Sequence, residues 1–417
     1  MLVRWIGLTG AAALVLAAAL TNAAAEEIKT DMSKGGITFS SGNNSLTIGA
    51  RAQFRYTGDD REGYDADTSG TGVGEEDGWS HQFAVQRMRL ILKGGMFRPW
   101  LKYEFQFELS NTSGDKDNKV KDAVIEIDKN PLLVLKMGQF KSPFSLQELT
   151  SSGRQQFVDR AITNAKFAPG RDQGFMLWGA TEKKFFGYSA GVFNGGGEAK
   201  AQDDQGLMYV ARVWIDPFGE YKLAESANDA PEKGILHAGL GLRAGEAIKG
   251  APTPGVFEDP DDEIAYNLEL AWKWRRWFAT GEYFMMTDEV TDRDPNSPTY
   301  LSSLPDVDSK GWHAQVGFMV VPKTAEVALR YATVDPDEDV ADDGVSEARA
   351  AFGWYFQGHN LKVQADYGQV KFSEGFTAYG SSSFPVRNMP SLDFSRRLGG
   401  AKDYTDQQVR VQVQVAF

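Results

Sequence analysis

The sequence predicts an all-β fold, a 16-stranded antiparallel transmembrane β-barrel. Three features predict it: about sixteen strand-like segments bounded by turn residues, a regular exchange of short and long connections between them, and a final segment, QVRVQVQVAF, that ends in an aromatic residue. In that segment Val409, Val411, Val413, Val415 and Phe417 share one face, because side chains alternate along a strand. One face therefore suits lipid and the other suits water.

The first residues have the form of a secretory signal peptide. Arg4 precedes an apolar run, and the alanines at residues 23–25 give the small-residue pattern that signal peptidase cuts. No later stretch approaches the roughly 20 apolar residues that a spanning helix needs. We therefore predict a signal peptide over residues 1–25, an N-terminal periplasmic segment over residues 26–45 and a barrel domain over residues 46–417.

Composition narrows the function classes. The 417 residues carry a formal net charge of −13, which argues against a nucleic-acid partner. The chain has no cysteine, so disulfides and cysteine-ligated zinc sites are excluded. Aromatic residues and glycine are abundant, which suits a sheet with polar loops better than an α/β enzyme. We expect no cofactor and no bound metal.

The strands are expected where alternation or apolar runs end in turn residues. In chain order they are residues 46–56, 83–95, 100–109, 121–128, 132–140, 174–180, 186–193, 207–216, 235–243, 264–274, 277–286, 311–320, 325–334, 346–356, 360–370 and 407–417. The short connections MFRP, KN, TEKK, RR, VPKT and QGHN alternate with long ones, except that residues 217–234 are long for their class. This pattern is typical of an outer-membrane barrel with short turns at one end and long loops at the other.

Tryptophans lie mostly near strand ends, as expected for an aromatic girdle at the membrane interface. They are Trp79, Trp100, Trp178, Trp214, Trp272, Trp274, Trp277, Trp312 and Trp354. The acidic surplus lies in three sequences that we interpret as solvated loops: GDDREGYDADTSGTGVGEEDG, FEDPDDE and DPDEDVADD. We expect the surroundings to be lipid and lipopolysaccharide of a Gram-negative outer membrane.

The strand faces directed away from lipid carry many cations. They are Arg51, Arg55, Arg87, Arg89, Lys102, Arg212, Arg243, Arg330, Arg349 and Arg410. Glu104 and Glu108 share these faces, so the predicted lumen is mixed but mainly basic. Arginine holds phosphate or carboxylate through paired hydrogen bonds, and conduction requires that each site release its ion. The sequence therefore predicts a porin for passive diffusion of small anions.

Five stretches resemble the phosphate-selective porin O and P family. They are KGGITF, LTIGARAQFRY, RMRLILKGGMFRPWLKYEFQFELS, KDAVIEI and KMGQFKSPFSLQELTSSGRQQFVDRAITNAKFAPGRDQG. The resemblance is strong from about Lys34 to Gly174. It implies a homotrimer of sixteen-stranded barrels, each narrowed by an inward-folded third long loop, here about residues 141–173. It also implies phosphate or polyphosphate as the solute.

The resemblance implies the residues of the anion pathway as well. Positions that match the family's phosphate-contacting motifs are Arg51, Arg87, Lys102, Asp122, Ser151 and Ser152. The expected pathway also includes Arg89 and three basic residues at or in the third loop, Lys141, Arg154 and Arg160.

Two positions depart from the family pattern. Met88 replaces the second arginine of a pair, and Arg89, on the same face as Arg87, can substitute for it. Glu148 replaces a loop lysine that contacts phosphate. A carboxylate in a narrow, poorly screened site would repel phosphate. We therefore expect anion preference rather than high phosphate affinity.

Two alternatives stay open: a general or weakly selective porin for other small solutes, and a structural or adhesive barrel with a plugged lumen. We do not expect an enzyme. GYSAG, residues 187–191, fits the hydrolase pattern G-x-S-x-G, but it lies in an expected strand rather than at a strand-turn-helix elbow. The four histidines, His81, His237, His313 and His359, have no partner motif.

Overall fold

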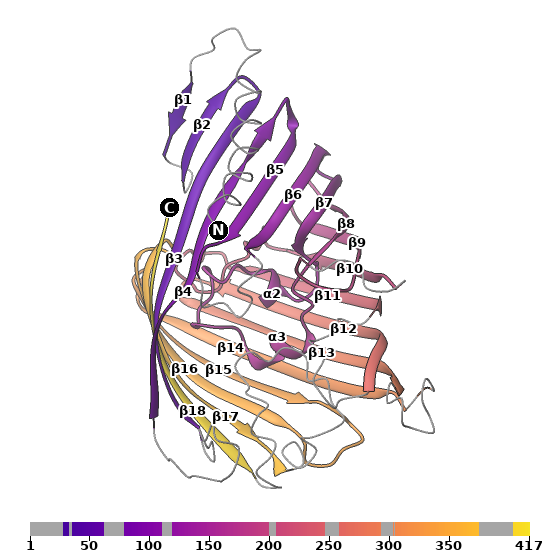
Figure 1. Ribbon diagram of the computed structural model, residues 1–417. Coiled ribbons are helices and arrows are strands. Elements are labelled where there is room, and N and C mark those ends of the chain that lie inside the picture. Colours follow the sequence, from indigo (N-terminus) through magenta and orange to yellow (C-terminus); the bar gives the residue numbers. More distant parts are fainter. Residues whose placement is uncertain are drawn as a thin grey trace, which may run out of the picture.

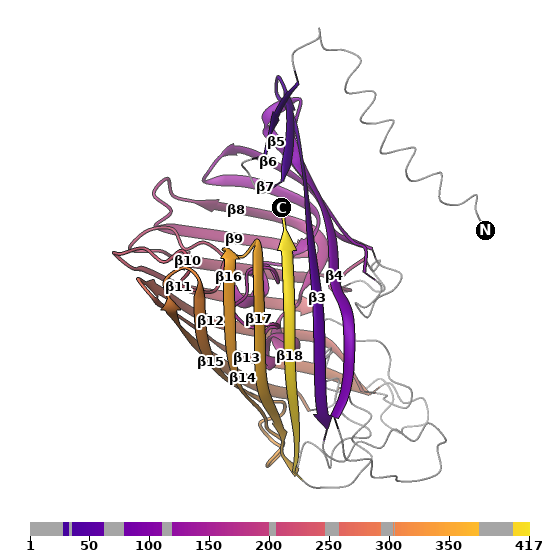
Figure 2. The ribbon, with the colours of Figure 1, turned by 90° about the vertical axis from the view of Figure 1, so that its left-hand side faces the viewer.

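The computed structural model describes residues 28–32, 36–61, 79–110, 119–199, 206–246, 258–292, 303, 305–374 and 403–417. The predicted signal peptide lies outside these ranges. Consecutive strands pair antiparallel around a ring, and the ring closes where β18 pairs with β3. Figure 2 shows these two strands, the last and one of the first in the chain, side by side.

Sixteen strands within the described ranges close the barrel. They are β3 (Asn44–Arg61), β4 (Trp79–Met96), β5 (Arg98–Glu108), β6 (Val120–Asn130), β7 (Leu133–Lys141), β8 (Arg171–Ala180), β9 (Phe186–Phe193), β10 (Met208–Ile215), β11 (Ile235–Glu246), β12 (Glu258–Trp274), β13 (Trp277–Asp292), β14 (Val307–Val321), β15 (Ala325–Asp335), β16 (Val345–Gln357), β17 (Leu361–Phe372) and β18 (Tyr404–Ala416). Each predicted segment overlaps one of them, so the predicted barrel is confirmed.

The observed strands differ from the predicted ones at the start of β12 and before the barrel. β12 begins at Glu258 and includes most of the acidic sequence FEDPDDE, which was predicted to be a loop. Its backbone pairs with β13 up to Glu258↔Asp292, so the cross-strand pairing continues past the apolar part of the strand. Before the barrel, β1 (Lys29–Asp31) and β2 (Ile37–Ser41) form a short hairpin, and β2 pairs with the start of β3. Neither short strand was predicted.

The two faces of β18 differ as alternation predicts. Val411, Val413 and Val415 are exposed on the outside of the barrel, whereas Arg410 and Gln412 are buried inside it. The outer tryptophans of β12 to β14 and β16 are likewise exposed. None of the helices in the described part of the chain is long and apolar enough to cross a membrane.

Two chain segments fill part of the barrel interior. The constriction loop, residues 142–170, joins β7 to β8 and contains α2 (Leu146–Leu149) and α3 (Ile162–Phe167). The inserted segment, residues 216–234, joins β10 to β11 and is the long connection noted in the sequence. Figure 1 shows α2 and α3 inside the curve of the sheet, and α3 contacts β13, β14 and β15.

Apolar packing holds both segments against one half of the wall. Phe167 of α3 stacks on Phe284 of β13 with ring centroids 5.1 Å apart. Leu146 of α2 and Tyr221 of the inserted segment share a buried cluster with Phe278. Because these contacts involve strands after β11, the open space lies along the strands before it.

Candidate anion pathway

A cavity of about 810 Å³ runs between the constriction loop and the inner face of β3 to β10. Nine of the eleven residues predicted for the anion pathway line it: Arg51, Arg87, Arg89, Asp122, Lys141, Ser151, Ser152, Arg154 and Arg160. The two others, Lys102 and Glu148, do not line this cavity. The structure therefore brings together side chains that come from the wall and from the loop.

The charges around this cavity are predominantly positive. Ten basic side chains line it: Arg51, Arg87, Arg89, Lys93, Lys136, Lys141, Arg154, Arg160, Arg171 and Arg212. Two acidic side chains line it, Glu104 and Asp122. Four more carboxylates pair with these cations but do not line the cavity, those of Glu108, Glu148, Asp159 and Glu269. A surplus of four positive charges remains after all six acids are counted.

Arg51 forms the link between the barrel wall and the constriction loop. Its guanidinium donates to Ser151 Oγ at 2.8 Å and to Ser152 Oγ at 3.1 Å. Because each serine oxygen accepts from Arg51, each hydroxyl proton is free to be donated to another acceptor. Gly153 permits this approach, since a Cβ there would meet Arg51 Nη1 at 2.5 Å. Arg51 itself has no ion pair within the described ranges.

The other wall cations are partly compensated. Arg89 pairs with Glu108 at 3.0 Å, and Arg171 pairs with Asp122 at 3.0 Å. Arg89 lies directly across from Arg51 in the β3–β4 register. It therefore reaches the same region of the cavity. The sequence suggested this residue as a replacement for the family arginine that is Met88 here. Among the ten cations that line the cavity, four have no ion pair to a described residue: Arg51, Lys93, Lys136 and Arg154.

Glu148 is buried beside two cations instead of facing the cavity. Its carboxylate lies 3.3 Å from Lys141 Nζ and 3.3 Å from Arg160 Nε. Both cations also donate to the Glu148 backbone carbonyl. Its charge is compensated at close range, and its effect on a permeating anion stays a prediction.

Lys102 lies at the short-turn end of β5, outside the cavity. Its side chain is 47% exposed and its ammonium pairs with Asp128 of β6. Alternation places Lys102 on the inner face correctly but says nothing of its depth in the barrel. Trp178 and Trp214 also depart from the prediction, because both line the cavity rather than the lipid-facing girdle.

Comparison with known proteins identifies the family. The sequence model of the phosphate-selective porin O and P family matches residues 54–378. The chain belongs to this family. It is 24% identical to Porin O of Pseudomonas aeruginosa over 317 residues, which are 67% of this chain and 66% of that protein, slightly less than two thirds of the relative's length.

Solved structures share the porin's barrel. The anion-selective porin from Comamonas acidovorans is 14% identical, with a TM-score of 0.54 over 90% of this chain and 100% of that one. The trimer form of OmpT of Vibrio cholerae is 11% identical, with a TM-score of 0.51 over 89% of this chain and 99% of that one. At these identities the structures show the fold, and the family places the porin in the Gram-negative outer membrane.

The hydrolase-like motif of the porin lacks a hydrogen-bonded base. Ser189 lies in β9, and its Oγ makes no hydrogen bond to the described residues. His237 is engaged elsewhere, by Asp216 at 2.6 Å and Glu269 at 3.2 Å. The family and the barrel are those of a channel rather than an enzyme.

Four basic residues of the pathway were absent from the predicted set: Lys93, Lys136, Arg171 and Arg212. For Arg212 the signal was present in the sequence, because strand alternation had already placed it on the inner face. The contribution of the inserted segment had no such signal. Leu223 from this segment lines the cavity, and Glu225 holds the constriction loop.

Proposed function

We propose that the porin forms a water-filled channel for passive diffusion of small anions, with phosphate or polyphosphate as candidate solutes. The observation that carries this proposal is the surplus of four positive charges around the cavity. The names of Porin O's family and of the anion-selective structural neighbour agree with it.

The geometry suits an oxyanion better than the sequence suggested. Arg51 presents a guanidinium, and Ser151 and Ser152 beside it have hydroxyl protons to donate, which together match an oxygen-rich anion. The ion pairs of Glu148 with Lys141 and Arg160 support weaker repulsion than its residue type implies. The uncompensated cations Lys93, Lys136 and Arg154 offer further contacts, and several moderate sites release an ion more readily than one strong site.

The reversal potential of the porin in a planar bilayer, measured across a potassium chloride gradient, tests this proposal. We expect the sign of an anion-selective channel. Cation preference would overturn it, and a potential near zero would favour the general porin. Absence of conductance by correctly folded protein would favour the plugged structural or adhesive barrel.

Arg51→Gln tests the phosphate hypothesis at its main contact. Loss of a charge-assisted hydrogen bond should raise the phosphate concentration that blocks chloride current by about tenfold or more. Lys102→Gln is the control, because Lys102 lies outside the cavity, and its block should match the wild type. Equal block in both variants would remove Arg51 from the pathway.

We also propose that the porin assembles as a homotrimer and contacts lipopolysaccharide at its long-loop end. The trimer form of OmpT, which shares this barrel, supports the first part. Chemical cross-linking of the folded porin in membranes should yield trimers, and a monomer at all cross-linker concentrations would contradict the assembly.

A further inference from the structure

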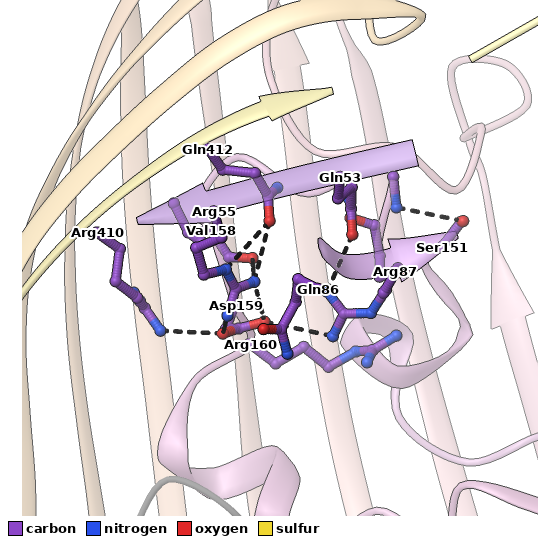
Figure 3. Close-up of polar contacts among 12 residues, drawn as sticks. Gln53, Arg55, Gln86, Arg87, Ser151, Val158, Asp159, Arg160, Arg410 and Gln412 are labelled. Atoms are coloured by element: carbon purple, nitrogen blue, oxygen red, sulfur yellow. Dashed lines mark hydrogen bonds and ion pairs between the residues drawn. The ribbon is translucent and has the colours of Figure 1, made fainter. Parts of the chain in front are cut away.

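A carboxylate of the constriction loop lies among arginines of the barrel wall. Asp159 Oδ2 is 2.6 Å from Arg55 Nη1 of β3 and 3.1 Å from Arg410 Nη1 of β18. Asp159 Oδ1 is 3.1 Å from Arg55 Nη2 and 3.4 Å from Arg87 Nη2 of β4. Figure 3 shows the three guanidinium groups converging on this one carboxylate.

The charges of this cluster do not balance. Arg55 and Arg87 have no other carboxylate partner within the described ranges. Arg55 also donates to Gln412 and to the Val158 carbonyl, and Arg87 also donates to Gln53. Arg410 alone has a second carboxylate, Asp366 at 2.8 Å. Three positive charges therefore face two negative ones. The Asp159 carboxylate is the one that contacts all three arginines.

This centre adjoins the cavity at Arg87, and its carboxylate is partly exposed. The Asp159 side chain is 31% exposed, whereas that of Asp366 is 0% exposed. Arg87 lines the cavity directly. A dissolved anion can therefore reach the place that the Asp159 carboxylate occupies.

The loop backbone is held here independently of the Asp159 carboxylate. Arg330 donates to the carbonyl of Asp159 at 2.9 Å and to that of Arg160 at 3.2 Å. Asp366 accepts from the backbone N–H of Val158 at 3.0 Å. The side chain of Asp159 can turn away while the loop keeps its position.

We propose that Arg55, Arg87 and Arg410 form a binding site for small oxyanions, in which Asp159 acts as a tethered competitor. Guanidinium groups bind carboxylate and phosphate by the same paired hydrogen bonds. A tethered carboxylate competes at an effective concentration in the millimolar range. Asp159 therefore keeps oxyanion binding weak and release fast. This inference rests on the proposed anion channel.

Asp159→Asn tests the competition, because it removes the charge at nearly constant size. We expect phosphate to block chloride current at about one tenth of the wild-type concentration, because the arginines are then free to form one more charge-assisted hydrogen bond to phosphate. The reversal potential should also become more anion-selective. Asp288→Asn is the control: Asp288 also pairs with the constriction loop, 3.5 Å from Lys166, but it is only 7% exposed and lies outside this cavity. It should behave as wild type.

The double variant Asp159→Asn with Arg87→Gln removes one charge of each sign and should return the block to near its wild-type value. Wild-type cation preference would overturn the proposed function. Wild-type anion preference with unchanged block in Asp159→Asn would overturn this inference alone. If the variants fail to fold, a structure of the wild type in high phosphate decides: anion density at the three arginines with Asp159 displaced supports the site, and its absence overturns it.

Discussion

At the scale of single residues, Glu148 shows how neighbours reverse the effect expected from residue type. Burial alone would raise the pKa of this carboxyl group, but the charges of Arg160, Lys141 and Arg171 lower it from its usual 4.5 to about 2. The group is therefore an anion at neutral pH and is held by its ion pairs. Glu148→Lys, which the sequence alone suggests as a route to stronger phosphate binding, would bury a third cation beside Lys141 and Arg160 and disturb the loop.

The lowered pKa of Glu148 predicts how the constriction responds to acid. Because the folded-state pKa lies below the usual value, the stabilisation from this carboxylate, about 3 kcal/mol, is complete above pH 4.5 and is lost as the pH falls towards 2. We expect single-channel conductance to be constant from pH 8 to 5 and to change below 4.5. Glu148→Gln should already differ from wild type at pH 7 and should respond less to acid.

The measurement is single-channel recording of both proteins at pH 7, 5, 4 and 3. If the wild-type conductance changes as much between pH 7 and 5 as between pH 5 and 3, the acid response comes from a titratable group other than Glu148.

At the scale of elements, the inserted segment supports the constriction loop. The Glu225 carboxylate accepts from the Gln156 backbone N–H at 2.9 Å and from the Gln315 and Gln147 side chains at 2.9 and 3.3 Å. The Glu225 backbone N–H donates to the Arg154 carbonyl at 2.8 Å. One side chain therefore ties the loop to the inserted segment and to β14.

Glu225→Ala should loosen the constriction. Three buried donors would lose an acceptor. The Gln156 backbone N–H would then be unsatisfied, at a cost of about 1–3 kcal/mol, whereas the Gln147 and Gln315 side chains keep one other acceptor each at 3.4 Å. We expect a larger and noisier single-channel conductance with weaker anion selectivity. Glu232→Gln in the same segment is the control, because the Glu232 side chain is 86% exposed and, among the described residues, forms an ion pair only with Arg275. Identical conductance in both variants would show that the inserted segment does not hold the loop.

The sequence predicted the strands, and the family resemblance predicted the inward-folded third loop and part of the cavity lining, but neither predicted the inserted segment. Strands follow from a period of two residues, which is local. Family motifs gave five of the nine predicted residues that line the cavity, and strand alternation and the basic residues of the third loop gave the other four. The course of residues 216–234 depends on contacts with distant partners, such as that of Glu225 with Gln315, which no local pattern encodes. Depth in the barrel is equally non-local, which explains the misplacement of Lys102.

At the scale of the whole molecule, the barrel wall has two different halves. The constriction loop and the inserted segment pack against the inner face of the later strands, so the open cavity follows β3 to β10. The outer face is apolar along both halves, with exposed Phe105 and Phe175 on one and Leu329 and Val413 on the other. The outer face is therefore apolar on both halves, while the cavity occupies one side of the interior.

Leu329→Arg tests this assignment of the outer face. Leu329 lies in the middle of β15 and is 63% exposed, whereas its neighbour Arg330 is 3% exposed on the inner face. An arginine on the lipid face near the bilayer midplane costs about 2–4 kcal/mol. We expect a loss of that size in the free energy of unfolding from liposomes, measured by urea titration, while Leu329→Phe, which keeps the site apolar, stays close to wild type. Equal stability of the two variants would mean that this face of β15 does not contact lipid, and the membrane orientation of the barrel would have to be reassigned.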